Sequence, residues 1–196
     1  MKRLFENTIQ NKSGLIHNSN CTRCALHATA QTVCIIGQGI WREPYVAPIM
    51  LVGEAPGSKE DSSGIPFVGE SGHWLRERID EVGISTFTYI TNAVKCRPPN
   101  NRCPARTELE ACQIYLRKEI KVLKPKIIVT LGRTAAAQMG WAQHAIGDMF
   151  YSNHRWGDFY CRLTYHPAYY LRTRSTAVEE NIVESLKWAK LQAGVI

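Results

Sequence analysis

The first notable absence in this chain of 196 residues is a long apolar run. No stretch reaches the roughly 20 apolar residues that a membrane-spanning helix needs, and the amino terminus lacks the apolar core of an export signal. Internal repeats, low-complexity tracts and a linker between domains are also missing. We therefore expect one globular domain that works in the cytoplasm and has no membrane partner.

Acidic residues are also few, because Asp and Glu number 17 against 24 Lys and Arg, which gives a formal net charge of +7. This balance favours a polyanionic partner such as nucleic acid, although a solvated basic face is an equally ordinary explanation. Seven cysteines are many for a chain without an export signal. Their odd number argues against a disulfide framework, so metal or cluster ligation is the better interpretation for some of them.

Four short apolar runs alternate with segments of helical periodicity. The runs cover residues 49–52, 87–90, 127–131 and 160–164. This alternation is typical of a parallel sheet with helices on both sides, joined by right-handed crossovers. The sequence therefore predicts an α/β protein: a three-layer α/β/α domain with a central four-stranded parallel sheet over residues 21–196, preceded by an amino-terminal arm, residues 1–20.

Several local signals refine this expectation. Gly83 and Pro125 are typical residues at which helices end. Thr176 and Glu179 have the spacing of a capping box, which predicts the start of the last helix. We also expect a short strand at residues 32–36 and a loop at residues 37–47.

The first apolar run leads into the segment MLVGEAPGSKEDSSGIPFVG, residues 50–69. Its glycines and prolines indicate a fixed loop whose backbone amides approach a ligand or another chain segment closely. In α/β proteins, binding sites lie at the carboxyl edge of the sheet, where such loops begin. An ordinary strand-to-helix turn would have a similar composition, so this segment alone predicts a binding loop without identifying its ligand.

Four of the cysteines have the spacing of ligands. Cys21 and Cys24 form a C-x2-C pair, and Cys96 and Cys112 follow at a distance that the fold could close. All-cysteine coordination suits tetrahedral zinc as well as an iron–sulfur cluster, and the spacing does not decide between them. We interpret Cys34, Cys103 and Cys161 as free thiols.

Four segments occur in an order that resembles the iron–sulfur uracil-DNA glycosylases of the family-4 type. These are GEAPGSKED (53–61), GIPFVG (64–69), TNAVKCRPPNNR (91–102) and YHPAYYLR (165–172). The resemblance runs from about residue 20 to about residue 190. It implies a monofunctional DNA glycosylase that flips uracil out of DNA and hydrolyses its bond to deoxyribose, leaving an abasic site for base excision repair. It also implies a [4Fe-4S] cluster on the four cysteines.

The resemblance implies roles for the residues that contact the base. His166 would donate a hydrogen bond to the departing uracil anion, Asn92 would select the uracil edge, and Phe67 would stack on the ring. Glu60 or Asp61 is the candidate for placing the water, because Ala55 stands where other uracil glycosylases carry an aspartate; a solvated acidic turn is the alternative for both residues. A further pair would line the substrate pocket: Gly53 and Glu54, with Glu54 as a wall against the thymine methyl group.

Other residues are expected to contact the nucleic acid. Ser71 would bind a phosphate at the start of a helix, and three arginines and three wedge residues are expected to contact DNA as well. The expected backbone contacts are Arg97, Arg102 and Arg172, and the expected wedge residues, in a loop after the histidine, are Tyr169, Tyr170 and Leu171. The implied partners are single- and double-stranded DNA that contains uracil, with repair or replication proteins as further candidates, and we expect a monomer that associates with the nucleoid.

Three rival functions stay open at this point. The first is a catalytically weak or inactive uracil- and DNA-binding module, because no carboxylate stands at Ala55. The second is a relative that traps the sugar covalently on a histidine, for which His144 and His154 are the candidates. The third is a zinc-binding interaction protein, which would be colourless.

Overall fold

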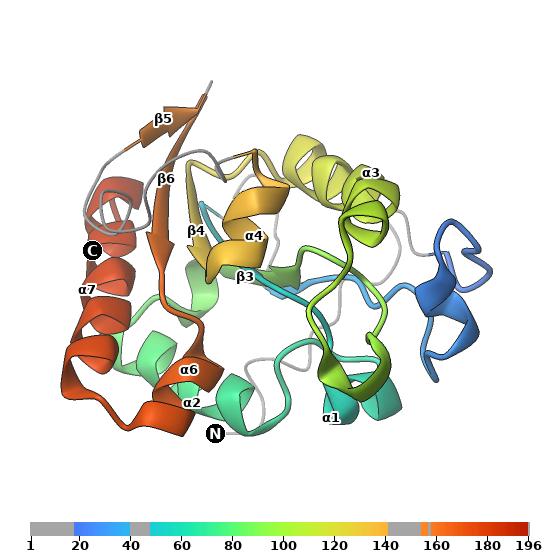
Figure 1. The fold of residues 1–196 in the computed structure, drawn as a ribbon. Coiled ribbons are helices and arrows are strands. Elements are labelled where there is room, and N and C mark those ends of the chain that lie inside the picture. Colours follow the sequence, from blue (N-terminus) through green and yellow to red (C-terminus); the bar gives the residue numbers. More distant parts are fainter. Residues whose placement is uncertain (1–17, 40–47, 141–153, 157, 196) are drawn as a thin grey trace.

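The fold is organised around a six-stranded sheet. The structure, a computed structural model, describes residues 18–39, 48–140, 154–156 and 158–195. The strands are β1 (Gln38–Gly39), β2 (Ile49–Gly53), β3 (Thr88–Asn92), β4 (Ile127–Leu131), β5 (His154–Trp156) and β6 (Phe159–Thr164). They lie in the order β1-β3-β2-β4-β6-β5 (Figure 1).

The predicted four-stranded parallel sheet is confirmed as the centre of this larger sheet. Strands β3, β2, β4 and β6 are parallel neighbours. Two short strands that were not predicted pair antiparallel at the edges, β1 with β3 and β5 with β6. The sequence expectation was therefore correct for the parallel core, to which the two short edge strands are added.

The expected strand at residues 32–36 is wrong, and the first edge strand lies instead within the expected loop, at β1. Cys34 adopts a left-handed backbone with φ 60°, which interrupts an extended run. Thr32 bonds through its backbone N–H to the side chain of Asp61 at 3.0 Å, and the Ile35 N–H donates to the Lys95 carbonyl at 2.8 Å. These contacts hold the segment as an irregular connection.

Helices cover both faces of the sheet, as predicted. The α-helices are α1 (Ser58–Ser63), α2 (Glu70–Val82), α3 (Arg106–Leu123), α4 (Arg133–Gln138), α6 (Pro167–Thr173) and α7 (Thr176–Ala193). Short 3-10 turns are η1 (Ala25–Ala28), η2 (Ser85–Phe87) and η3 (Pro99–Asn101). Helices α2 and α7 pack on one face of the sheet, and α3 and α4 pack on the other.

The residues of β2 show why both faces are covered. All five residues of this strand are buried. Ile49 and Leu51 belong to the core beneath α2 and α7, whereas Met50 and Val52 belong to the core beneath α3 and α4. Successive side chains of a strand point to opposite faces, so a continuous apolar run buries both sides and fits only the middle of a three-layer fold.

The helix ends agree with the sequence signals in two cases and differ in one. Gly83 ends α2 with φ 76°, and Lys124 ends α3 in the left-handed region immediately before Pro125. The expected capping box at Thr176 is wrong, because Ser175 is the N-cap of α7 and makes no side-chain capping bond.

Some predictions fall wholly or partly outside the described residues. Residues 1–17 of the predicted amino-terminal arm lie outside the described residues, as does His144, and for His154 only the backbone is described. Among the described helices, none is both long and apolar enough to cross a membrane.

Candidate active site

A cavity of about 480 Å³ opens at the carboxyl edge of the parallel strands. Strands β2 and β3 end there at Gly53 and Asn92, and β6 leads into it through His166. Nine of the residues singled out from the sequence line it: Glu54, Ala55, Glu60, Phe67, Ser71, Asn92, Arg102, His166 and Arg172. The structure therefore brings together most of the predicted site, in the place where α/β sheets bind ligands.

Gly53 allows the side chains of Phe67 and Asn92 to approach the end of β2. A Cβ atom on Gly53 would lie 2.4 Å from the Phe67 ring and 2.5 Å from Asn92 Oδ1. Both distances are far below van der Waals contact, so only glycine fits here. The ends of the two strands are also tied beyond the sheet, because the Ala93 N–H donates to the Gly53 carbonyl at 2.8 Å.

Asn92 presents an unsatisfied acceptor at this point. Its side chain is buried with 3% exposure, and its Oδ1 has no hydrogen-bond partner among the described residues. Leaving a buried acceptor unpaired costs about 1–3 kcal/mol. An unpaired acceptor that lines a cavity fits a ligand that brings its own N–H donor.

Phe67 is held in a strained conformation beside Asn92. Its backbone has φ 56°, a region that bulky residues rarely occupy. Arg76 Nε donates to the Phe67 carbonyl at 3.0 Å, and a Cβ atom on Gly72 would lie 2.2 Å from the Phe67 carbonyl carbon. The first turn of α2 therefore fixes Phe67 from behind, and its ring forms one wall of the cavity.

His166 lies across the cavity from Phe67 as the N-cap of α6. The two ring centroids are 6.2 Å apart with an interplanar angle of 28°. The backbone N–H of Ala168 donates to His166 Nδ1 at 3.1 Å, so the neutral ring carries its proton on Nε2. Burial, with a smaller contribution from the Arg172 charge and against the effect of Glu60, lowers the pKa of His166 to about 4. The imidazole is therefore a neutral donor at neutral pH.

Glu60 is buried, and its carboxylate organises the loop around it. One oxygen accepts the N–H groups of Val68 and Gly69 at 2.9 Å and 2.7 Å, and the other accepts that of Gly57 at 3.1 Å. Both halves of the glycine-rich segment are thus fastened to one side chain. With an exposure of only 8%, Glu60 does not belong to a solvated acidic turn.

Glu54 is fixed by a hydrogen bond from helix α4. Thr134 of α4 donates its hydroxyl to Glu54 Oε2 at 2.5 Å, and the Cys103 sulfur lies 3.9 Å from the same oxygen. The Glu54 charge raises the pKa of the exposed Cys103 thiol. Cys103 therefore lies at the rim of this cavity and not beside the other cysteines.

The residues expected to contact nucleic acid fall into two groups. Ser71, Arg102 and Arg172 line the cavity. Arg97 instead donates to Asn101 Oδ1 at 2.8 Å. Arg102 also forms an ion pair with Glu108, with an N–O distance of 2.6 Å.

The expected loop after the histidine is wrong, because its three wedge candidates lie in α6. Pro167 occupies the first helical turn after the His166 cap, a position that favours a helix. Tyr170 packs on Trp74 with ring centroids 4.6 Å apart. Tyr169 is 41% exposed, whereas Leu171 is half-buried.

Sequence reasoning missed several residues of the cavity wall. These are Pro98, Asn101, Cys103 and Ala168. Asn101 follows Asn100 in the left-handed region, with φ 54° and 53° respectively. Two consecutive asparagines after two prolines were a signal for such a turn, because asparagine tolerates this conformation better than other residues.

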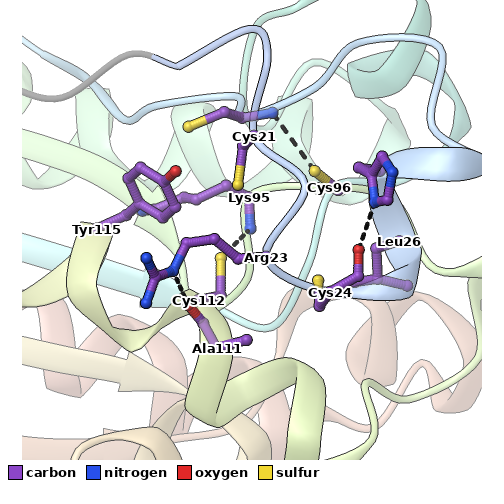
Figure 2. A pocket seen from close by; sticks show the side chains of 11 residues that line it. Cys21, Arg23, Cys24, Leu26, Lys95, Cys96, Ala111, Cys112 and Tyr115 are labelled. Atoms are coloured by element: carbon purple, nitrogen blue, oxygen red, sulfur yellow. Dashed lines mark hydrogen bonds between the residues drawn. The ribbon is translucent and has the colours of Figure 1, made fainter.

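A second, smaller cavity gathers the predicted ligand cysteines (Figure 2). The side chains of Cys21, Cys24, Cys96 and Cys112 point toward one shared space in this view. They come from the amino-terminal segment, the connection after β3 and helix α3. Cys34, which we interpreted as a free thiol, lines the same cavity, whereas Cys161 is buried in the sheet core.

Backbone N–H groups in this cavity point at two of the sulfurs, as they do around metal-bound thiolates. The Cys34 N–H donates to Cys96 Sγ at 3.4 Å and the Lys95 N–H donates to Cys112 Sγ at 3.2 Å. Burial raises the pKa of Cys96 to about 11 and that of Cys112 to about 12, so both thiols keep their protons at neutral pH unless a cation displaces them. Within the described ranges, no three His, Cys, Asp or Glu side chains converge closely enough to hold one metal ion.

Comparisons with known proteins identify the family of this chain. The model of the uracil DNA glycosylase superfamily matches residues 40–190. A type-4 uracil-DNA glycosylase of Pyrobaculum aerophilum is 41% identical over 162 residues, covering 78% of this chain and 80% of that protein. Another, of Thermotoga maritima, is 38% identical over 173 residues, covering 87% and 88% respectively. A third, of Archaeoglobus fulgidus, is 45% identical over 118 residues, covering 60% and 57%. The chain belongs to the uracil DNA glycosylase superfamily, and its relatives place it with the type-4 glycosylases.

Proposed function

We propose that this chain hydrolyses the N-glycosidic bond of deoxyuridine in DNA and leaves an abasic site for base excision repair. The observation that carries the proposal is the unpaired Asn92 Oδ1 beside the Phe67 ring. This acceptor matches the N3–H of uracil, and the amide nitrogen matches the O4 acceptor. Cytosine offers a bare N3 acceptor to the same oxygen, so the site rejects it.

His166 stabilises the leaving base in this mechanism. As the bond between C1′ and N1 breaks, negative charge spreads from N1 onto the uracil O2. The Nε2–H of a neutral imidazole donates to that oxygen, and burial strengthens the interaction. Water supplies a hydroxyl group to C1′, and its remaining proton balances the uracil anion. The sugar needs no covalent bond to the protein.

Phe67, the glycine-rich segment and Glu54 shape the slot for the flipped base. The ring stacks on uracil, and its strained backbone keeps it in place before the base arrives. We assign Glu60 a positioning role, because its two oxygens already accept three backbone N–H groups. Glu54, fixed by Thr134, provides the wall against which a thymine methyl group would clash.

The nucleic-acid strand follows the rim of the cavity in this proposal. Arg102 and Arg172 meet phosphates, and Ser71 adds a contact from the first turn of α2. Arg97 adds a further positive charge beside them. Tyr169 is the exposed candidate for the wedge, because Tyr170 is already packed on Trp74. Leu171, which is half-buried, is the second wedge residue.

The cysteine cavity holds a [4Fe-4S] cluster in this proposal. Cys21, Cys24, Cys96 and Cys112 are its ligands. The cluster supplies no electrons to a hydrolysis and acts as a clasp between the amino-terminal segment and α3. The sulfur-directed N–H groups of Cys34 and Lys95 support this assignment, because such bonds stabilise charge on ligating sulfurs.

The remaining expectations are part of the same proposal. The protein is a monomer with one catalytic domain, which follows the amino-terminal arm. It acts on both single- and double-stranded DNA. Its substrate places it in the cytoplasm at the nucleoid, where repair or replication proteins are accessible to it.

Base release from labelled oligonucleotides tests the function. We expect release of uracil, no release of thymine, and a rate about 10²–10³ times lower for His166→Ala. His73→Ala is a matched control, because this exposed histidine does not line the cavity. No uracil release from either strand form would overturn the proposal, and a heat-stable protein–DNA adduct would replace it with covalent trapping.

The cluster is tested separately by iron analysis. We expect about four iron atoms per chain and a visible iron–sulfur absorbance. Cys96→Ser should lose both, whereas Cys161→Ser should keep them, because Cys161 lies in the sheet core. Stoichiometric zinc in a colourless protein would contradict the cluster assignment without affecting the assignment of the reaction.

A further inference from the structure

A fully buried ion pair lies between the two cavities and has no part in the mechanism above. Lys95 and Glu119 have side-chain exposures of 1% and 3%, and Lys95 Nζ lies 2.7 Å from Glu119 Oε2. Burying two charges is unfavourable unless both are well hydrogen-bonded, and apolar residues of similar size often stabilise a protein as well or better. A pair in this position therefore calls for a role other than stability.

The ammonium group of Lys95 is completely satisfied, and one of its partners is the base-selecting residue. Besides Glu119, Nζ donates to Thr91 Oγ1 at 2.6 Å and to the main-chain carbonyl of Asn92 at 2.9 Å. An ammonium has three donors, so each one is used. The bond to the Asn92 carbonyl fixes the main chain that carries the unpaired Oδ1.

The carboxylate of Glu119 anchors the other side of this pair. It accepts the Tyr89 hydroxyl at 3.1 Å and the Gly37 N–H at 3.0 Å, as well as the Thr91 hydroxyl at 2.9 Å. Strand β3 and the segment before β1 thus meet on one side chain of α3. This helix cannot shift relative to β3 without breaking these bonds.

The backbone of Lys95 belongs to the cysteine cavity. Its N–H donates to Cys112 Sγ, and its carbonyl accepts the Ile35 N–H at 2.8 Å. Cys112 and Glu119 lie on the same helix, seven residues or about two turns apart, so they share a face. Lys95 therefore connects the end of β3 to the segments that carry the ligand cysteines.

We propose that Lys95 is a positioning residue: with Glu119 it holds the main chain at Asn92 so that the amide already faces uracil. This inference rests on the proposed function. Lys95 does not touch the base, because its side chain is buried behind β3 and does not line the substrate cavity. Without Lys95, the main chain at Asn92 can move, so the Asn92 amide is no longer preorganised to bond the base in the transition state.

The test separates positioning from stability by comparing single and double variants. Lys95→Met leaves the Glu119 charge buried alone, so we expect a lower Tm as well as slower uracil release. The double variant Lys95→Met/Glu119→Gln removes both charges and keeps an acceptor for Tyr89 and Gly37. We expect its Tm to return to near the wild-type value, while its single-turnover rate stays about 10–100 times lower.

Three further readouts and a control complete the experiment. The iron content and the Kd for undamaged DNA, measured by fluorescence anisotropy, should be unchanged in the double variant, and KM should change far less than the rate. Arg78→Met is the control, because it removes an ion pair with Glu179 between α2 and α7, away from Asn92. Its rate should match the wild type.

The outcomes distinguish this inference from the proposed function. An active wild type whose double variant recovers both Tm and rate would overturn the positioning role alone. Loss of iron or of DNA binding in the double variant would also overturn it, because the pair would then be structural. A wild type that releases no uracil would overturn the proposed function and this inference with it.

Discussion

The two cavities of this protein differ in whether their buried polar atoms have hydrogen-bond partners. In the substrate cavity, Asn92 Oδ1 is buried without a partner among the described residues, and Phe67 adopts a strained backbone. In the cysteine cavity, Cys96 and Cys112 sulfurs accept backbone N–H groups, and the neighbouring Lys95 ammonium has three acceptors.

This difference is the one expected if the first cavity takes a transient ligand and the second holds a permanent group, as proposed above. A cavity that releases its product keeps unpaired groups and strain, because the transition state must gain what the free protein lacks. A cavity that holds a resident group is completed by the surrounding backbone. Substitutions should therefore reduce the rate on one side and the stability or iron content on the other.

The largest expected effect comes from removing the unpaired acceptor. Asn92→Ala should lower the single-turnover rate of uracil release about 10²–10³-fold, because the transition state loses a prearranged hydrogen bond. The iron content and Tm should change little, since Oδ1 has no partner to lose among the described residues. Parallel measurements of uracil release, iron and thermal unfolding would check this.

Retained activity in Asn92→Ala would contradict the assignment of this amide to base recognition. A large loss of Tm or iron would instead contradict the separation of the two cavities, because it would show that Asn92 also supports the group in the cysteine cavity.

The second-largest loss of rate is expected from adding a side chain at Gly53, between Phe67 and Asn92. Gly53→Ala would place a methyl group 2.4 Å from the Phe67 ring and 2.5 Å from Asn92 Oδ1. Displacing either group by about 1 Å should reduce uracil release about 10²-fold. Gly194→Ala is the control, because no atom lies within 4 Å of its added Cβ. An unchanged rate in Gly53→Ala would show that neither wall needs its present position.

The sequence predicted the parallel core and grouped most of the residues that line the larger cavity. The four central strands are apolar along their length because both faces are buried, which leaves a clear signal. The strand ends then place Gly53, Asn92 and His166 at one edge of the sheet. The four motif segments therefore meet in the structure as the resemblance implied.

What the sequence did not reveal depends on contacts between distant segments. The edge strand β1 has only two residues, so it leaves no periodic pattern. Nothing local indicates that Glu60 receives N–H groups from both halves of its loop, nor that Cys34 reaches the cysteine cavity. The Lys95–Glu119 pair joins residues from a strand connection and a helix, and its burial is a property of the packed fold.

A smaller effect is expected at the rim of the substrate cavity. Arg172→Ala should weaken DNA binding severalfold and reduce the slope of log Kd against log salt by about 1, because one phosphate contact is lost. Anisotropy titrations at several salt concentrations measure this slope. Arg106→Ala provides a control, since this exposed residue pairs with Glu110 on the first turns of α3 and does not line the cavity. An unchanged slope in Arg172→Ala would remove this arginine from the DNA contacts.

The smallest expected effect is in the pH dependence of the rate. Because burial lowers the pKa of His166 to about 4, the ring stays neutral and the rate should show no step from His166 between about pH 5 and 8. An inflection near the ordinary histidine pKa of about 6.5 that disappears in His166→Gln would contradict a neutral donor.

The lowered pKa of His166 should make the stability depend on pH below about 6.5, although the rate does not depend on it there. In the unfolded chain His166 titrates near pH 6.5, whereas the folded protein resists its protonation until about pH 4. Between these values the unfolded state binds a proton that the folded state does not. The free energy of unfolding is therefore not reduced by His166 above about pH 6.5, and it is reduced progressively as the pH falls toward 4. The loss of Tm on acidification should therefore be smaller for His166→Gln than for the wild type. An equal loss in both proteins would show that the ring is not shielded, and the substrate cavity would then be open to water before uracil enters.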